Sequence, residues 1–384
     1  MERIQAINRR RIEWCCDELR MAPDELAAVL EMSPDRWAEF WSDDVGLTFN
    51  QLRKLADFFG RGVLFFLDTG PVAPEQVHTP QFRTLAQQKP ELSPRLKRLI
   101  ERVERQREVF LSLRDDLDDA FWTPFQAPEL PADDIAAAAG QTRQWLGLGE
   151  GNHDFESYRK AVEAKGLLVF RTNGYNGPWQ IAKESAVAGF ALYDVRCPVI
   201  VVKKMVAEAA QSFTLMHELA HVLLHKTSWI DDDTDFLATQ GREQEANLLA
   251  GLVLVPDYFL LSIKDADKPK EVAAFHEWLK PQRKAWGVST EVILRRLLAV
   301  GRLSPEIYQA YRAWSLEAHQ NRKDEGGTRL YRHREPKHIF GDRFVRTVLS
   351  SLSAQRITLA KASGYLDGLK IADLHELEQH CAGT

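Results

Sequence analysis

Two histidines with a glutamate between them, His217-Glu218-Leu-Ala-His221, stand in a stretch of the chain that is otherwise apolar and has helical periodicity. In a helix, residues four apart lie on one face, so both imidazoles can reach a single ion. Imidazole nitrogens bind zinc at about 2.0–2.1 Å. The spacing therefore predicts a zinc centre with His217 and His221 as ligands and Glu218 as a general base beside them.

A third ligand must come from elsewhere, because catalytic zinc usually takes three protein ligands and leaves the fourth position to water. His225 lies about 12 Å along the helix axis from His217 and about 80° around it, so we expect it at the helix end instead. Glu243 and Glu245 begin a later helix that can fold back. We predict Glu245 as the ligand, with Glu243 facing another direction. Glu245→Ala is then expected to weaken zinc binding severely, and Glu243→Ala or His225→Ala to leave it nearly intact.

The predicted centre fits peptide hydrolysis. Zinc lowers the pKa of a bound water toward about 7, and Glu218 would take its proton. A substrate strand is expected to pair with the free edge of the strand at 189–193. The acidic run 231–235 lacks the glycine and closing glutamate of a calcium loop, so we expect a solvated loop near the site.

Helices and strands alternate in a way that predicts an α+β fold. β-type runs at Leu167–Phe170, Ala188–Tyr193 and Pro198–Val202 indicate a small sheet of three strands. From Ala207 the pattern is helical almost to the end, which places most helices on the C-terminal side.

The chain also divides along its length. Short helices fill residues 1–70. A linker with a long charged helix, expected either to lie across another domain or to mediate dimerisation, fills 71–130. The metal motif lies within 131–300, and a helical region with a basic patch at Arg329–Arg346 fills 301–384.

The composition is that of an ordinary globular protein, with 45% hydrophobic and 27% charged residues and a net charge of −5 over 384 residues. No apolar run has the length or flanks of a signal peptide, and none approaches the roughly 20 residues of a membrane span. The four cysteines form no Cys-x-x-Cys pair. We therefore expect a cytoplasmic protein without a membrane partner.

Several segments together resemble the ImmA/IrrE family of zinc metallopeptidases over about residues 150–300. The resemblance implies a zincin-like core, Zn²⁺ as cofactor and the glutamate of Glu-Ala-Asn, here Glu245, as the third ligand. It also implies a protein substrate, commonly a helix-turn-helix repressor cut after stress or DNA damage. The matching segments are 189–194, 198–202, Phe213-Thr-Leu before the histidines, Glu245-Ala-Asn247, Pro256, Trp286-Gly-Val-Ser289 and Arg295-Arg-Leu297.

The N-terminal segment resembles the helix-turn-helix domain of XRE-type regulators, but its charge is unfavourable for DNA. Residues 1–70 contain 9 Lys and Arg against 13 Asp and Glu, a net charge of 9 − 13 = −4. We expect this module to recognise a protein, with Trp37 and Trp41 as a candidate anchor, and any contact with single-stranded or duplex DNA as activator to fall on Arg329–Arg346. The rival interpretation is a DNA-binding transcriptional regulator that uses the zinc fold as a sensor without proteolysis.

Overall fold

The computed structural model describes most of the chain, and its contacts divide the chain into two compact units, Met1–Arg102 and Val103–Thr384. The division falls within the long helix α8 (Pro94–Leu117). The described residues are 3–42, 45–72, 85, 88, 92–117, 124–174, 177–205, 207–232, 240–320 and 332–382. Within these ranges no helix is long and apolar enough to cross a membrane.

The first unit is a bundle of short helices, as the sequence predicts, with a small strand pair in addition. β1 and β2 pair in antiparallel fashion, with Ile4 opposite Leu47. The Thr48 hydroxyl and the Gln51 side chain form a capping box that begins α4. The elements are β1 (Arg3–Ile4), α1 (Arg9–Glu18), α2 (Glu25–Val29), α3 (Pro34–Ser42), β2 (Leu47–Thr48), α4 (Phe49–Phe59) and α5 (Val63–Leu67).

The two tryptophans of α3 belong to the core of this unit. Trp37 is only 3% exposed and stacks on Phe40, with ring centroids 5.3 Å apart. Trp41 is partly buried and meets Trp37 edge to face at 5.6 Å. The burial of Trp37 excludes it as an anchor for a partner, whereas Trp41 keeps a partly exposed side chain.

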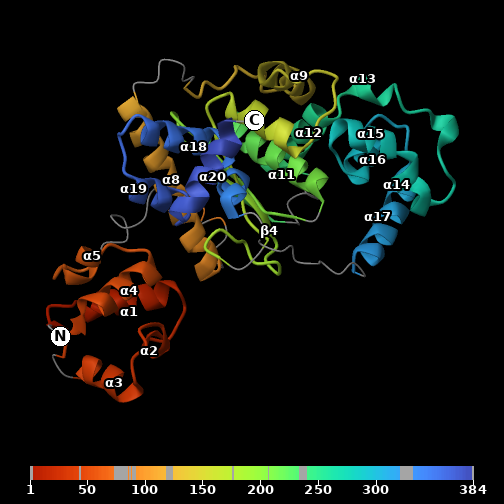
Figure 1. The fold of residues 1–384 in the computed structure, drawn as a ribbon. Coiled ribbons are helices and arrows are strands. Elements are labelled where there is room, and N and C mark those ends of the chain that lie inside the picture. The colour runs from red at the N-terminus through yellow and green to blue at the C-terminus, as the bar shows by residue number, and fades with distance from the viewer. Residues whose placement is uncertain are drawn as a thin grey trace. The chain divides into compact units, whose positions relative to one another are not determined.

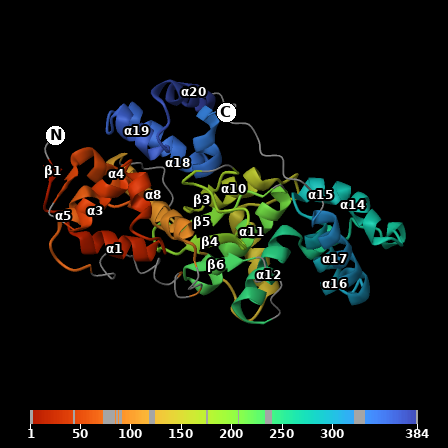
Figure 2. The ribbon, with the colours of Figure 1, turned by 90° about the horizontal axis from the view of Figure 1, so that it is seen from below.

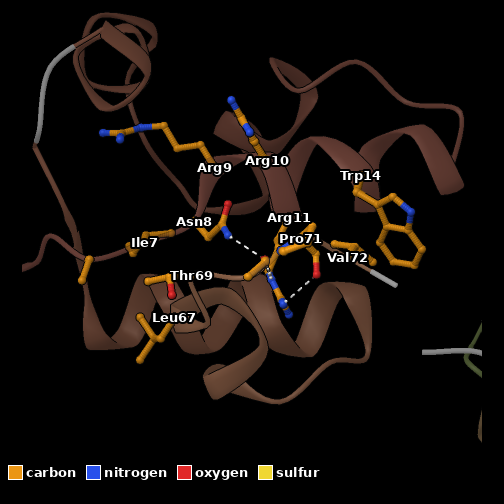
Figure 3. A pocket seen from close by; sticks show the side chains of 12 residues that line it. Ile7, Asn8, Arg9, Arg10, Arg11, Trp14, Leu67, Thr69, Pro71 and Val72 are labelled. Atoms are coloured by element: carbon orange, nitrogen blue, oxygen red, sulfur yellow. Dashed lines mark hydrogen bonds between the residues drawn. The ribbon is translucent and has the colours of Figure 1, made fainter. Parts of the chain in front are cut away.

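Arg9 and Arg11, at the start of α1, bind the unit's own backbone. They line a cavity of about 820 Å³ between this helix start and the segment after α5, whose lining side chains are drawn in Figure 3. Arg9 donates to the carbonyl of Phe40 at 2.7 Å, and Arg11 donates to the carbonyls of Phe65 and Gly70 at 3.1 Å each. Arg9 thus joins α1 to α3, and Arg11 joins α1 to α5 and to the segment after it, so both guanidinium groups add little to a phosphate-binding surface.

The second unit contains a four-stranded sheet in the order β3-β5-β4-β6, visible in Figure 2. β3 and β5 are parallel, whereas β4 is antiparallel to both of its neighbours. The three predicted strands are confirmed, and every residue in them is buried. The fourth strand was not predicted from the sequence. The strands are β3 (Leu168–Arg171), β4 (Val187–Leu192), β5 (Val199–Val202) and β6 (Trp229–Asp232).

Helices cover this sheet and make the fold α+β, as predicted. α11 packs on β4 and β5 and lies beside α12, as Figure 1 shows. The helices around the motif are α9 (Ile135–Leu146), α10 (Phe155–Glu163), α11 (Glu208–Ala220), the π-helix η1 (His221–His225) and α12 (Gly241–Leu254). Those that follow are α13 (Asp257–Leu260), η3 (Asp265–Asp267), η4 (Val272–Ala274), α14 (Phe275–Trp278), α15 (Lys280–Trp286), α16 (Thr290–Ala299), α17 (Pro305–Gln320), η5 (Arg332–Arg334), α18 (Glu335–Ser353), α19 (Leu359–Tyr365) and α20 (Ile371–Ala382).

The C-terminal helices pack on the sheet and belong to the same compact unit. Phe170 of β3 meets Phe340 and Phe344 of α18 edge to face, at centroid distances of 5.6 and 5.8 Å. The buried Arg159 donates to the carbonyls of Val169 and Ile339 at 2.6 and 3.0 Å. One guanidinium thus joins α10, β3 and α18, so α18 supports the sheet from its β3 side.

The sequence predicted an apolar surface on α8 and a basic surface near the C-terminus. Both are largely occupied by contacts within the protein. Most apolar residues of α8 are buried, Leu99 and Ile100 among them, so most of this stripe is not available as a dimer surface. In the described part of the basic patch, Lys337 and Arg346 both pair with Asp342. This pairing lowers the charge available to a nucleic acid.

Glu163 forms a buried polar contact with α18. Gly341 has φ 80° and ψ 172°, which kinks α18 and brings its backbone onto this glutamate. A Cβ on Gly341 would lie 1.9 Å from Glu163 Oε1, so only glycine fits. Complete burial raises the pKa of Glu163 to about 7, although Arg159 and Arg343 act in the opposite direction.

We predict that Glu163→Gln removes a pH dependence of stability. The folded chain keeps the Glu163 proton up to about pH 7, whereas an unfolded chain releases it near pH 4.5. Its stabilising contribution is therefore complete below pH 4.5 and is lost as the pH rises through about 7. The free energy of unfolding of the variant, relative to wild type, should increase between about pH 5 and 8 in denaturant titrations. Glu156→Gln on the same helix is the control, and a difference independent of pH would refute the prediction.

Candidate metal centre

Four side chains meet in the interior of the second unit and form a group that could hold a metal ion. His217 and His221 come from α11 and the start of η1, Asp231 from β6 and Glu243 from α12. One donor atom of each lies within 4.8 Å of the others. Both histidines and Asp231 are completely buried. The structure therefore brings the two predicted histidine ligands together, and it adds two carboxylates.

The donor atoms are spaced as a small tetrahedral site requires. The two Nε2 atoms of His217 and His221 are 3.1 Å apart, and Glu243 Oε2 lies 3.2 and 3.6 Å from them. Asp231 Oδ2 lies 3.1 and 3.5 Å from the same two nitrogens. Tetrahedral donors on bonds of about 2.0–2.1 Å stand roughly 3.3–3.4 Å apart. The residues present therefore fit a zinc-sized ion.

The charges of the group also favour a cation. Burial disfavours a charged His217, but the adjacent carboxylates of Asp231 and Glu243 outweigh it and raise the pKa of His217 to about 9. Asp231 has both carboxylate oxygens buried without a hydrogen bond of good geometry. A buried and a partly buried carboxylate side by side need a positive charge between them, and a divalent ion supplies it better than one proton does.

Glu245, the predicted third ligand, does not reach this group. Its Oε2 lies 3.0 Å from Nε2 of His225, and Glu243 takes the predicted place instead. The two glutamates are two residues apart and so point about 200° apart around α12. Glu243 continues the buried stripe of Ala246 and Ala250, at positions i+3 and i+7. That stripe was the signal in the sequence that could have identified it.

His225 and Glu245 act one contact further out. Nδ1 of His225 lies 2.9 Å from Nδ1 of His221, on the side of the ring away from the other donors. If Nε2–H of His225 donates to Glu245, Nδ1 of His225 accepts from His221, and Nε2 of His221 keeps its lone pair for a metal. Ligand histidines are commonly oriented through their outer nitrogen in this way. His225 thus orients a ligand, a contact that the predicted helix-end role did not include.

Trp229 supports two of the four donors. Its ring stacks on His221 with centroids 4.9 Å apart and planes 9° apart. Its indole Nε1–H donates to Oε1 of Glu243, which leaves Oε2 to face the histidines. A ring and a hydrogen bond from β6 therefore fix the orientation of two of the candidate donors, His221 and Glu243, which come from two different helices.

Glu218, the predicted base, is completely buried and lies against β4 at Gly189. A Cβ on Gly189 would stand 2.6 Å from Glu218 Oε1, 2.7 Å from Thr214 Cγ2 and 2.9 Å from the carbonyl oxygen of Val201. The absence of a side chain at Gly189 thus makes room for the carboxylate beside the strand.

Two predictions about the surroundings of the centre are wrong. Asp231 is not in a solvated loop but in β6, where it is 0% exposed, while residues 233–235 of the acidic run lie outside the described residues. The strand at 189–193 has no free edge for a substrate, because β4 pairs with β5 on one side and β6 on the other. An acidic sequence does not indicate a strand, and only the paired structure reveals it.

The comparisons with known proteins agree with this geometry. Residues 163–298 match a family model described as Peptidase M78, IrrE N-terminal-like domain. A protein of Bacillus phage phi105 named uncharacterized immunity region protein 2 is 32% identical over 93 residues, which cover 23% of this chain and 57% of that protein. The chain thus spans somewhat more than half the length of this relative. Residues 163–298 thus match the model of the ImmA/IrrE peptidase family, in agreement with the resemblance found in the sequence, and they include all four donors and Glu218.

We predict a ranking of metal affinity that follows the contacts. His217→Ala, His221→Ala and Glu243→Ala remove direct donors and should abolish stoichiometric zinc. Glu245→Ala should weaken zinc binding by about 10–100-fold, because it frees His225. Zinc content and chelator competition measure both effects.

Gln244→Ala, an exposed position between the two glutamates, is the control for this ranking and should bind zinc as wild type does. A larger loss in Glu245→Ala than in Glu243→Ala would reinstate the ligand chosen from the sequence.

We predict that Gly189→Ala displaces Glu218 and leaves the metal ligands in place. Overpacking against Thr214 and the Val201 carbonyl should lower the free energy of unfolding by about 1–3 kcal/mol. The variant should take up one zinc per chain in metal analysis. It should lose peptide hydrolysis, for which Glu218 is the predicted base. Gly177→Ala is the control, since its Cβ would meet only Asn173 Nδ2 at 4.0 Å. If Gly189→Ala has the same free energy of unfolding as wild type, the strand accommodates the added methyl group and the prediction is wrong.

Proposed function

We propose that this protein is a zinc-dependent endopeptidase that cleaves a regulatory protein. In this proposal His217, His221 and Glu243 hold the zinc, and Glu218 is the general base. The observation that supports it most directly is the buried donor group with tetrahedral spacing inside the segment that matches a peptidase family. We assign to Glu245 the role of orienting His225, in place of its predicted role as a ligand.

Zinc, when bound, would polarise a peptide carbonyl and lower the pKa of a coordinated water toward about 7. The remaining chemistry falls to Glu218, which follows His217 directly in α11. Its carboxylate would accept a proton from the attacking water and donate it to the departing amine, a role that typically accelerates a reaction by about 10²–10⁴-fold. The buried position of Glu218 favours this role, because few other water molecules can take the proton that it carries from the attacking water to the amine.

A protein substrate fits the family, and we propose a helix-turn-helix repressor as its class. The phage relative is named for an immunity region. Stress or DNA damage as the trigger, DNA as an activator and a cytoplasmic location complete the proposal. The N-terminal segment 1–70, with its net charge of −4, is assigned to recognition of a protein and not to reading duplex DNA.

We predict that Glu218→Gln keeps one zinc per chain and loses cleavage by at least about 10²-fold. The amide occupies the same volume but cannot accept the proton. The assay incubates the purified full chain with helix-turn-helix proteins encoded beside it, and follows the products by mass spectrometry.

Glu208→Gln is the matched control, a half-exposed glutamate in the first turn of the same helix. Cleavage by Glu218→Gln at the wild-type rate would refute the assignment of the base. Zinc binding without cleavage of any tested repressor by the wild type would favour the rival function, a regulator that senses zinc without proteolysis.

A further inference from the structure

We infer that Asp231 is a fourth protein donor to the metal, and that β6 thereby holds the peptidase in a closed state from which a substrate must displace it. This inference rests on the proposed function, because it requires a metal on His217, His221 and Glu243. It adds a residue and a mechanism of control to that centre. The argument uses the contacts of Asp231, the number of donors and the position of β6.

Asp231 lies on the inner side of the histidine rings, where the metal would be. Its Oδ2 contacts Nε2 of both His217 and His221, at 3.1 and 3.5 Å. These are the same nitrogens that face each other and Glu243. A carboxylate that only orients a ligand histidine contacts the outer ring nitrogen, the position that His225 takes toward His221. The contacts of Asp231 are therefore those of a ligand.

The number of donors distinguishes an open centre from a closed one. Catalytic zinc keeps three protein ligands and one position for water, whereas structural zinc is surrounded by four protein ligands. His217, His221 and Glu243 alone would form an open centre. With Asp231 the set reaches four, so no position is left for water or for a substrate carbonyl.

β6 also occupies the edge of the sheet at which an extended substrate would pair. Gly189 of β4 is opposite Asp231, and Ala191 is opposite Trp229. Extended peptides commonly bind proteins by adding a strand to such an edge. Because alternate residues of a strand point to one face, Trp229 and Asp231 both face the centre while Ile230 is buried on the other side. One short strand thus fills the substrate's place on the sheet and the fourth place on the metal.

The pairing of β6 is suited to exchange. The strand has four residues, and its register with β4 is irregular between Val187 and Gly189. A substrate strand that replaces β6 on β4 would withdraw Asp231 at the same time, because the two are parts of one segment. Opening of the metal centre is thereby coupled to binding of the substrate backbone.

The test uses the full chain loaded with Co²⁺, which reports its coordination through visible absorption, and acetohydroxamate as a small ligand for an open position. Asp231→Ala should bind acetohydroxamate at least tenfold more tightly than wild type, with a change in the cobalt spectrum. It should also hold the metal at least tenfold more weakly in chelator competition. Asp231→Asn, which keeps the volume of the side chain, should shift both values in the same direction and serves if the alanine variant does not fold.

Asp232→Asn is the matched control, because this half-buried neighbour lies on the opposite face of β6. It should bind both Co²⁺ and acetohydroxamate as wild type does. If wild type and the Asp231 variants each bind one Co²⁺ and have equal affinities for metal and hydroxamate, the inference is wrong and the proposed centre stands. If wild type binds no stoichiometric Co²⁺, the proposed function itself fails.

Discussion

The placement of the buried Asp231 and the partly buried Glu243 beside two imidazoles is the constraint on which the rest of the second unit depends. Removing two carboxylates from water costs several kcal/mol each unless opposite charge compensates for it. His217 with a raised pKa provides part of that charge, and a divalent ion in the same position would provide more. The elements that deliver the four side chains must therefore hold them against their mutual repulsion.

The sheet and its two flanking helices meet that demand. α11 rests on β4 and β5 and is flanked by α12. Apolar packing along this helix therefore fixes the positions of His217 and of His221, which follows its last residue. Gly189 leaves space for Glu218 where a larger residue would collide with it. On the far side, Arg159 fastens α18 to β3 through backbone carbonyls, which supports the strand layer from its other edge. The stability of the centre is thus distributed over segments far apart in sequence.

Much of this arrangement follows from local patterns. Apolar runs between turn residues identify β3, β4 and β5, and the spacing of His217 and His221 identifies the helix that carries the two histidine donors of the candidate metal centre. β6 escaped detection because Trp-Ile-Asp-Asp has neither the alternation nor the composition of a strand. Its stability comes from pairing with β4 and from contacts of Trp229 and Asp231 at the centre, which are tertiary interactions.

The sequence by itself determined that two histidines and a glutamate share one helix, because the helical repeat alone places residues four apart on one face. It also indicated that a glutamate of the following helix approaches them. Only the tertiary structure decided that this residue is Glu243, since the rotation of α12 about its axis is set by which side packs against α11. It alone placed Asp231 among the donors, because strand pairing with β4 joins parts of the chain that no local pattern relates.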